Sequence, residues 1–152
     1  MAEYIAINEQ TVAAGQNVLL NSRIPCNRGN IIHRDGSGNV ILRGYVNNPC
    51  AGYARYKIDF QANIAIPTGG TATNPIALAI SVDGEIDQAS LGISTPGAVD
   101  QYNSVSGGTY IDVPRGMAMT VSITNAPAST DTTYVQGSIN VQNANLVITR
   151  VA

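Results

Sequence analysis

Charged residues are scarce in this sequence. Asp, Glu, Lys and Arg together make up 12% of its 152 residues, about half the share that is usual in globular proteins. Asn, Thr, Ser, Gln and Gly take their place. The net charge is -2 and no basic cluster is present to attract phosphate, so we expect no nucleic-acid partner. A neutral polar surface lowers the electrostatic cost of bringing copies together, which favours self-association.

Long apolar segments are also absent. No run reaches the roughly 18 apolar residues of a membrane-spanning helix. The opening residues Met1–Ala6 lack the basic region and the extended apolar run of a secretory signal. We therefore expect no membrane segment and no signal peptide. The protein is expected to fold in a cytoplasm and to finish elsewhere if a particle carries it.

Residues that carry catalysis are few. His33 is the only histidine, and no Gly-x-Ser-x-Gly elbow, phosphate loop or metal-ligand spacing accompanies it. A hydrolase that used His33 would also need a nucleophile and an orienting carboxylate. Asp83, Glu85 and Asp87 alternate around a glycine as calcium ligands do, but the segment is too short to supply six ligands. We predict a non-enzymatic protein with no catalytic residue, cofactor or metal.

Helical periodicity is missing, whereas runs rich in Val, Ile, Thr and Tyr recur between Gly, Pro, Asn and Asp. About eight to ten antiparallel strands in a single domain over residues 1–152 predict a β-sandwich or barrel. The expected strands are Tyr4–Ile7, Gln10–Leu20 with a turn at 14–17, Asn30–Arg34, Val40–Tyr45, Arg55–Ile66, Pro75–Val82, Ile86–Thr95, Tyr110–Val113, Met117–Thr124 and Gly137–Val151 with a bend at 142–145.

Two of these segments, and the turn that follows the second, have clear patterns. Arg55–Ile66 alternates apolar and polar residues, which predicts a strand with one buried face. Pro75–Val82 is almost continuously apolar, which fits a strand buried on both faces. Asp83-Gly84, which follows it, is a preferred dipeptide of two-residue hairpin turns.

Two cysteines are too few for a disulfide scaffold. Cys26 and Cys50 are equally distant from residue 38, and the expected hairpin turn is centred near Ser37. Residues equidistant from a turn lie opposite each other on the paired strands if the register holds. A Cys26–Cys50 disulfide would close a loop of about 25 residues and add about 3 kcal/mol. Two buried thiols in a reducing cytoplasm are the alternative.

Arginine outnumbers lysine seven to one, and its planar bidentate side chain is favoured at interfaces. Arg28, Arg34, Arg43 and Arg55 lie in or beside the expected hairpin. Our hypothesis is that some of them pair with carboxylates of a neighbouring subunit. The alternative is that they are solvated residues at strand ends.

Tyrosine is the main aromatic residue, with seven copies and no tryptophan. Tyr45 and Tyr53, together with Asn47 and Asn48, combine aromatic faces with amides, a combination suited to sugars. They are therefore candidates for a ligand surface. Packing of strand tyrosines at the sheet edges is the alternative.

Four segments carry a resemblance to a known family. They are Asn74–Glu85 with its Val-Asp-Gly hairpin, Tyr110–Gly116 with its Val-Pro-x-Gly turn, Thr120–Asn125, and the closing strand Asn143–Ala152. They resemble the tumour-necrosis-factor and complement-globular-head jelly rolls in the form found in bacteria and their phages. The resemblance covers about the last hundred residues, and the first fifty more loosely. The opening residues Ala2–Asn8 and the segment 25–29 are similar to short prophage structural proteins of gut Firmicutes.

The resemblance implies an antiparallel jelly-roll β-sandwich that assembles as a homotrimer. In phages such modules serve as capsid decorations, head fibres or tail-tip domains, and the lack of a Gly-X-Y repeat argues against a collagen-like stalk. We expect a trimeric virion structural protein at the virion surface, assembled in the host cytoplasm. Its partners would be its own copies and the major capsid protein or another virion component. The alternative is a glycan- or receptor-binding tip that contacts a host-surface glycan.

Overall fold

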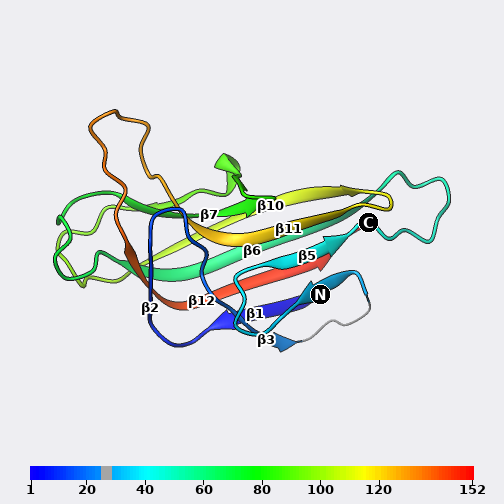
Figure 1. The fold of residues 1–152 in the computed structure, drawn as a ribbon, viewed down its shortest axis with the longest axis horizontal. Helices are drawn as coiled ribbons and strands as arrows, with labels where there is room; N and C mark the ends of the chain where they lie inside the picture. The colour runs from blue at the N-terminus through cyan, green and yellow to red at the C-terminus, as the bar shows by residue number, and fades with distance from the viewer. Residues whose placement is uncertain (25–28) are drawn as a thin grey trace.

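The computed structural model describes residues 1–24 and 29–152. Within them, twelve strands and one short 3-10 helix form two antiparallel sheets packed face to face (Figure 1). Sheet A has the order β10-β6-β12-β1-β3, with β2 also paired to β12. Its strands are β1 (Ala2–Ala6), β2 (Gln10–Val12), β3 (Asn21–Ile24), β6 (Tyr53–Ala65), β10 (Asn103–Pro114) and β12 (Ile139–Arg150).

Sheet B has the order β4-β5-β11-β7-β8, with β9 also paired to β7. Its strands are β4 (Ile31–His33), β5 (Val40–Arg43), β7 (Ile76–Val82), β8 (Glu85–Ile86), β9 (Gly92–Ser94) and β11 (Ala118–Ala126). The architecture is therefore an all-β jelly-roll sandwich, as the sequence predicts.

The core lies between the sheets and is built by period-two alternation. In β6 the inward positions from Tyr56 to Ile64 are buried, and they alternate with polar residues that face out. Six of the seven residues of β7 are buried, which confirms a strand covered on both faces. Asp83 and Gly84 both have positive φ, at 51° and 87°, as a type I′ hairpin turn requires.

Strand β10 is longer than the predicted Tyr110–Val113, and two glycines explain the difference. A Cβ on Gly107 would overlap the carbonyl oxygen of Ser90, and one on Gly108 would overlap the carboxylate of Asp59. The segment pairs with β6 over its whole length, from Asn103 to Pro114, and at Gly107 the close approach of the Ser90 backbone requires glycine. Glycine and serine weaken the strand pattern in the sequence, so the prediction there was wrong.

The predicted strand Ile86–Thr95 was also wrong as one continuous element. It divides into β8, the 3-10 helix η1 (Gln88–Ser90) and β9. Asp87 caps the helix by accepting a hydrogen bond from the Ala89 amide. The Ser90 hydroxyl donates to the Asp87 carbonyl and accepts from the Ile80 amide, at 2.8 Å each. These local side-chain bonds to the backbone replace strand pairing.

The molecule is elongated, and its loops gather at two ends (Figure 1). The β5–β6 loop (44–52) and the β10–β11 turn (115–117) lie at one end, toward which both chain termini also point. The loops 66–75, 95–102 and 127–138 lie at the opposite end. The predicted bend in the last strand is present as a register shift between Gln142 and Asn145.

Candidate functional site

The outward face of sheet A, here called the assembly face, carries large side chains without cover. Tyr110 on the edge strand β10 is 62% exposed, and Tyr53 on β6 is also exposed. Ile5 on β1 and Val147 on β12 are half-buried on the same face, because they alternate with core residues. Tyr110 lies opposite Lys57 of β6, and Ile5 and Val147 lie on strands further across the sheet. A large exposed aromatic side chain in the middle of a strand is typical of an interaction surface.

The strongest ion pair on the assembly face joins β6 to β10. Arg55 donates from Nε and Nη2 to the two carboxylate oxygens of Asp112, at 2.7 Å each. These two residues are cross-strand neighbours. The hydrogen bonds from Arg55 lower the pKa of the Asp112 carboxyl, and they raise the pKa of the guanidinium. The Arg55 guanidinium also lies 5.2 Å from the centroid of the Tyr53 ring, which adds a cation–π contact.

The remaining charges on the assembly face are satisfied in the same way. Lys57 Nζ lies 3.1 Å from the Asp59 carboxylate, and hydrogen bonding to Asp59 raises the pKa of the lysine. The Asn145 amide donates to the Glu3 carboxylate at 2.7 Å. Each charged side chain that the structure describes on this face therefore has a partner within the chain. Such a face can be covered by another protein without leaving a charge unpaired.

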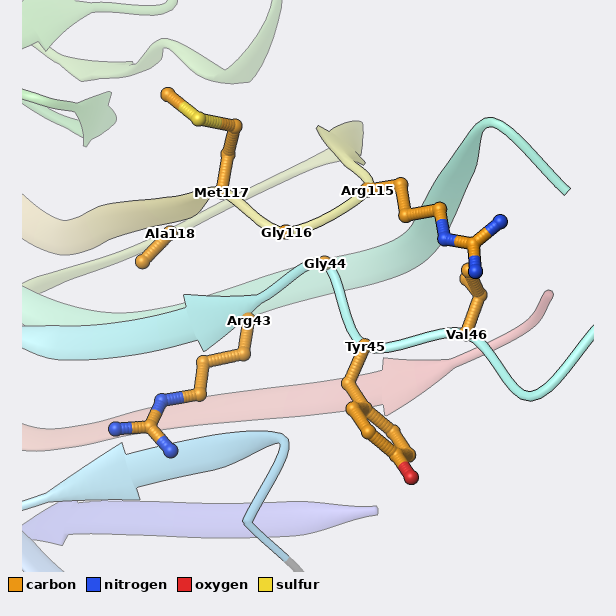
Figure 2. Close-up of a pocket in the computed structure, with 8 residues that line it drawn as sticks. All are labelled: Arg43, Gly44, Tyr45, Val46, Arg115, Gly116, Met117 and Ala118. Atoms are coloured by element: carbon orange, nitrogen blue, oxygen red, sulfur yellow. The ribbon is translucent and has the colours of Figure 1, made fainter. Parts of the chain in front are cut away.

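A shallow pocket of about 420 Å³ lies at the end of the sandwich where β5 and the β10–β11 turn meet. We call it the end pocket (Figure 2). Its lining residues are Arg43, Gly44, Tyr45, Val46, Arg115, Gly116, Met117 and Ala118. Tyr45 and Met117 are 62% and 61% exposed. Figure 2 shows Arg43 and Tyr45 projecting to one side, Met117 to the other, and the Arg115 guanidinium well apart from that of Arg43.

The backbone around the end pocket is held by hydrogen bonds from two sides. The Gly44 amide donates to the Met117 carbonyl at 2.8 Å, and the Gly116 amide donates to the Gly44 carbonyl at 3.0 Å. The Arg115 amide donates to the Gly52 carbonyl at 2.9 Å. A Cβ on Gly44 would overlap the Pro114 carbonyl, so this approach requires glycine.

Among the described residues, the two arginines of the end pocket have no acidic partner. The Arg115 guanidinium donates to the Pro49 carbonyl at 2.6 Å, which fixes its position without neutralising its charge. Arg43 makes no ion pair within residues 1–24 and 29–152. The hypothesis that Arg55 pairs with a neighbouring subunit is not needed, since Asp112 of the same chain binds it. Arg28 lies outside the described residues.

A second, polar pocket of about 500 Å³ lies on the outward face of sheet B, and we call it the hydroxyl pocket. Three of its hydroxyls are buried: Ser81 on β7, and Ser122 and Thr124 on β11. The Ser81 and Ser122 oxygens lie 2.6 Å apart, and Thr124 lies 2.9 Å from Ser81. Thr124 also donates to the Asn17 side chain, whose amide donates to Asn39.

Sequence reasoning missed the hydroxyl pocket. The alternation of Thr120, Ser122 and Thr124 with apolar residues indicates a polar outward face. It does not reveal that Ser81 pairs with Ser122 across the sheet.

The candidate ligand surface predicted from the sequence is not assembled as one site. Tyr45 lines the end pocket, but Asn47, Asn48 and Tyr53 do not. The Asn48 side chain accepts a hydrogen bond from the Cys50 amide and so stabilises its own loop. Tyr53 instead stacks with Arg55 on the assembly face.

The cysteine prediction involves a residue that the structure does not describe. Cys26 lies outside the described residues, and Cys50 is exposed in the β5–β6 loop. The β4–β5 hairpin forms as expected, with Ile31 opposite Leu42 and His33 opposite Val40. This register centres the turn between residues 36 and 37 rather than at 38, so equal spacing from the turn does not support the disulfide. The disulfide stays a prediction.

His33 bridges the two sheets at one side of the sandwich. Its side chain is 1% exposed. One ring nitrogen contacts the Ser22 hydroxyl and the other donates to the Ser37 carbonyl, at 2.9 Å each. The ring centroid lies 4.5 Å from that of Tyr4. The two nitrogens thus link β4 to β3 and to the β4–β5 turn, and the ring contact links β4 to β1.

The carboxylates near the β7–β8 turn do not form a metal site in the described part of the chain. Within it, no group of three or more His, Cys, Asp or Glu side chains is arranged to hold a metal, and Asp83, Glu85 and Asp87 form none. The Asp83 carboxylate instead accepts from the Thr120 amide at 2.8 Å. No helix in the same residues has the length and apolar character of a membrane span.

Comparison with known proteins shows the fold. No protein-family model matches the chain, and no curated protein sequence matches it. Solved structures do match over nearly the full length. The Eiger TNF of S. frugiperda has a TM-score of 0.59 at 10% identity, covering 100% of this chain and 92% of that one. The globular domain of a zebrafish complement 1qA protein has a TM-score of 0.53 at 13% identity, covering 96% and 94%.

Murine APRIL at pH 5.0 gives a TM-score of 0.50 at 14% identity, with 95% of this chain and 97% of that one covered. At these identities the likeness concerns the fold alone. The chain therefore has the two-sheet jelly roll of tumour-necrosis-factor and complement globular domains.

Proposed function

We propose that this chain is a non-catalytic structural module that assembles as a homotrimer through its assembly face. In keeping with the resemblance of its sequence, it serves as a capsid decoration or head-fibre protein on the surface of a bacteriophage particle. The particle forms in the host cytoplasm, and the major capsid protein or another virion component is the partner.

The observation that carries the proposal is the contrast on the assembly face between exposed large side chains and paired charges. Tyr110 is exposed beside the Arg55–Asp112 pair, whose charges cancel locally. A contacting copy would cover apolar area at about 25 cal/mol per Å² without desolvating an unpaired charge. A three-fold assembly would also match the local three-fold points of a capsid lattice.

The absence of catalysis in this proposal is supported by His33. A general base must come within reach of the proton that it abstracts from a substrate. The side chain of His33 is only 1% exposed, so it offers no surface at which a substrate could bind.

The test is the molar mass in solution by light scattering on a sizing column. The wild-type chain should have about three times the monomer mass of 15.9 kDa, stable on dilution. Tyr110→Asp should shift the mass toward the monomer with an unchanged far-ultraviolet circular dichroism spectrum. Ile93→Asp is the matched control, because Ile93 is an exposed strand residue of sheet B. A wild-type monomer, or equal effects of both variants, would contradict the proposal.

The virion role needs its own measurement. The chain should be present in gradient-purified particles of the phage whose genome encodes it, in a fixed ratio to the major capsid protein. Its absence from such particles would leave the trimer but remove the virion role.

The second candidate function, a glycan- or receptor-binding tip, is favoured by the hydroxyl pocket. Hydroxyl and amide groups both donate and accept hydrogen bonds, as the hydroxyls of a sugar do. A panel of purified bacterial surface polysaccharides would test it. Asn39→Ala at the exposed rim of the pocket should abolish binding, whereas Asn47→Ala in the β5–β6 loop should not. The reverse result would restore the ligand surface predicted from Tyr45, Asn47, Asn48 and Tyr53.

A further inference from the structure

The few charges of this chain are distributed unevenly along its long axis. The end with the loops 66–75, 95–102 and 127–138 carries Asp100 and Asp131 and no basic residue. The opposite end carries Arg43 and Arg115, and its segments 44–52 and 115–117 contain no acidic residue. Arg43 and these two segments therefore carry a local excess of positive charge, although the net charge of the chain is -2.

The side chains at the positive end are those enriched in protein interfaces. Arg43, Arg115, Tyr45 and Met117 line the end pocket together, and arginine, tyrosine and methionine are over-represented in interface cores. The Arg115 guanidinium is held by the Pro49 carbonyl, so less conformational entropy is lost when it binds. Gly44 and Gly52 fix the backbone beneath it.

The two arginines come from different segments of the end pocket. Figure 2 shows their guanidinium groups pointing in different directions, with Tyr45 and Val46 between their side chains. A surface that presents several carboxylates can contact both.

We propose that the end pocket is the docking surface for an acidic protein partner, with Arg43 and Arg115 pairing with carboxylates and Tyr45 packing against the partner. This inference rests on the proposed function, because it names the face by which the trimer docks on a virion component. The end pocket is formed by β5 of sheet B and the β10–β11 turn, and none of its lining residues is among those described on the assembly face.

A carboxylate surface fits better than a polyphosphate. In the described part of the chain, no basic stripe follows the end pocket, as an extended polyphosphate chain would need. Tyrosine and methionine beside two arginines suit a mixed protein surface.

The probe for the test is immobilised poly-L-glutamate, measured with the full chain on a biosensor at low and at about 300 mM salt. The wild type should bind at low salt and weaken as salt rises. Arg43→Gln combined with Arg115→Gln should weaken binding about tenfold, since each exposed ion pair contributes a few-fold. Arg34→Gln is the matched control, because Arg34 is exposed at the opposite end of the β4–β5 hairpin. It should bind within about twofold of the wild type.

Three outcomes would overturn the inference. The first is no binding by the wild type, and the second is an equal effect of the double variant and of Arg34→Gln. The third is an oligonucleotide that binds as tightly as polyglutamate, which would indicate a general polyanion surface. A further result would replace the virion component as the partner. If the molar mass of the wild type grows with concentration beyond that of a trimer, and the double variant prevents this growth, the end pocket binds the acidic end of another copy.

Light scattering on the same samples separates this inference from the proposed function. A double variant that remains trimeric but no longer binds polyglutamate supports both proposals. A wild type that binds polyglutamate as a monomer contradicts the trimer alone. The lysine pair Arg43→Lys with Arg115→Lys keeps the charge, so it should recover most of the binding if charge rather than folding is responsible.

Discussion

Gly44 offers a sharp test of how the end pocket is built. Its Cβ would overlap the Pro114 carbonyl oxygen and crowd the Val113 carbonyl, so Gly44→Ala must separate the end of β5 from the β10–β11 turn. Separation breaks the hydrogen bonds from Gly44 to Met117 and from Gly116 to Gly44. At about 1 kcal/mol for each bond, the free energy of unfolding should fall by about 2 kcal/mol. For a chain of this length the melting temperature should fall by about 4–8 °C.

The assay is urea unfolding followed by circular dichroism, with Gly52→Ala as the control. Gly52 lies in the same loop, has no atom within 4 Å of the position that a Cβ would take, and keeps the carbonyl that accepts from Arg115. Its replacement should be neutral or stabilise slightly, by reducing the freedom of the unfolded chain. If Gly44→Ala lies within about 0.5 kcal/mol of Gly52→Ala, the backbone contact is not what shapes the end pocket. Gly44→Ala should also weaken polyglutamate binding, because it displaces the turn that carries Arg115.

Three further predictions concern stability. His33→Ala removes two ring hydrogen bonds from a buried side chain. It should lower the free energy of unfolding, measured in urea, by about 2–3 kcal/mol. A loss below about 0.5 kcal/mol would contradict the bridging role of His33. Ser90→Ala leaves the buried Ile80 amide without its acceptor and should cost about 1–3 kcal/mol by the same measurement. The pKa of Asp112 is lowered from 3.8, so the Arg55 pair stabilises the fold above about pH 4 and this contribution disappears as the pH falls through the lowered pKa. Asp112→Asn should remove that part of the acid dependence in a pH series of thermal melts, and an unchanged profile would refute the assignment.

Much of the fold follows from local patterns in the sequence. The alternation of β6, the double burial of β7 and the Asp83-Gly84 turn are all read from spacing and turn chemistry. The elements that were missed depend on contacts between distant residues. Strand β10 extends through Gly107 because it pairs with β6 over its whole length, and β3 forms beside β1 with no pattern of its own. Neither contact leaves a periodic signal.

The candidate sites show the same division. The sequence singles out Arg43 and Arg55 as interface candidates and Tyr45 as a candidate ligand residue, but their roles depend on neighbours that only the fold supplies. Arg55 is neutralised by Asp112 from a strand 57 positions away in the chain, whereas Arg43 makes no ion pair within the described residues. The hydroxyl pocket likewise needs Ser81 and Ser122 to meet across two strands. The sequence shows which residue types are suited to an interface. It does not show which side chains contact one another in the folded chain.

Because charged residues are scarce in this molecule, the few unpaired ones strongly affect which partner each surface can bind. On the assembly face the described charges are already paired, so covering it with another copy costs little electrostatic free energy and places no demand on the charge of the neighbour. At the end pocket Arg43 and Arg115 keep their charge, so covering them with an apolar surface would be costly and only an acidic one compensates. The two surfaces thus select different partners by the same rule. For that reason a change at Tyr110 should alter molar mass, a change at Arg43 should alter docking, and neither should produce the effect of the other.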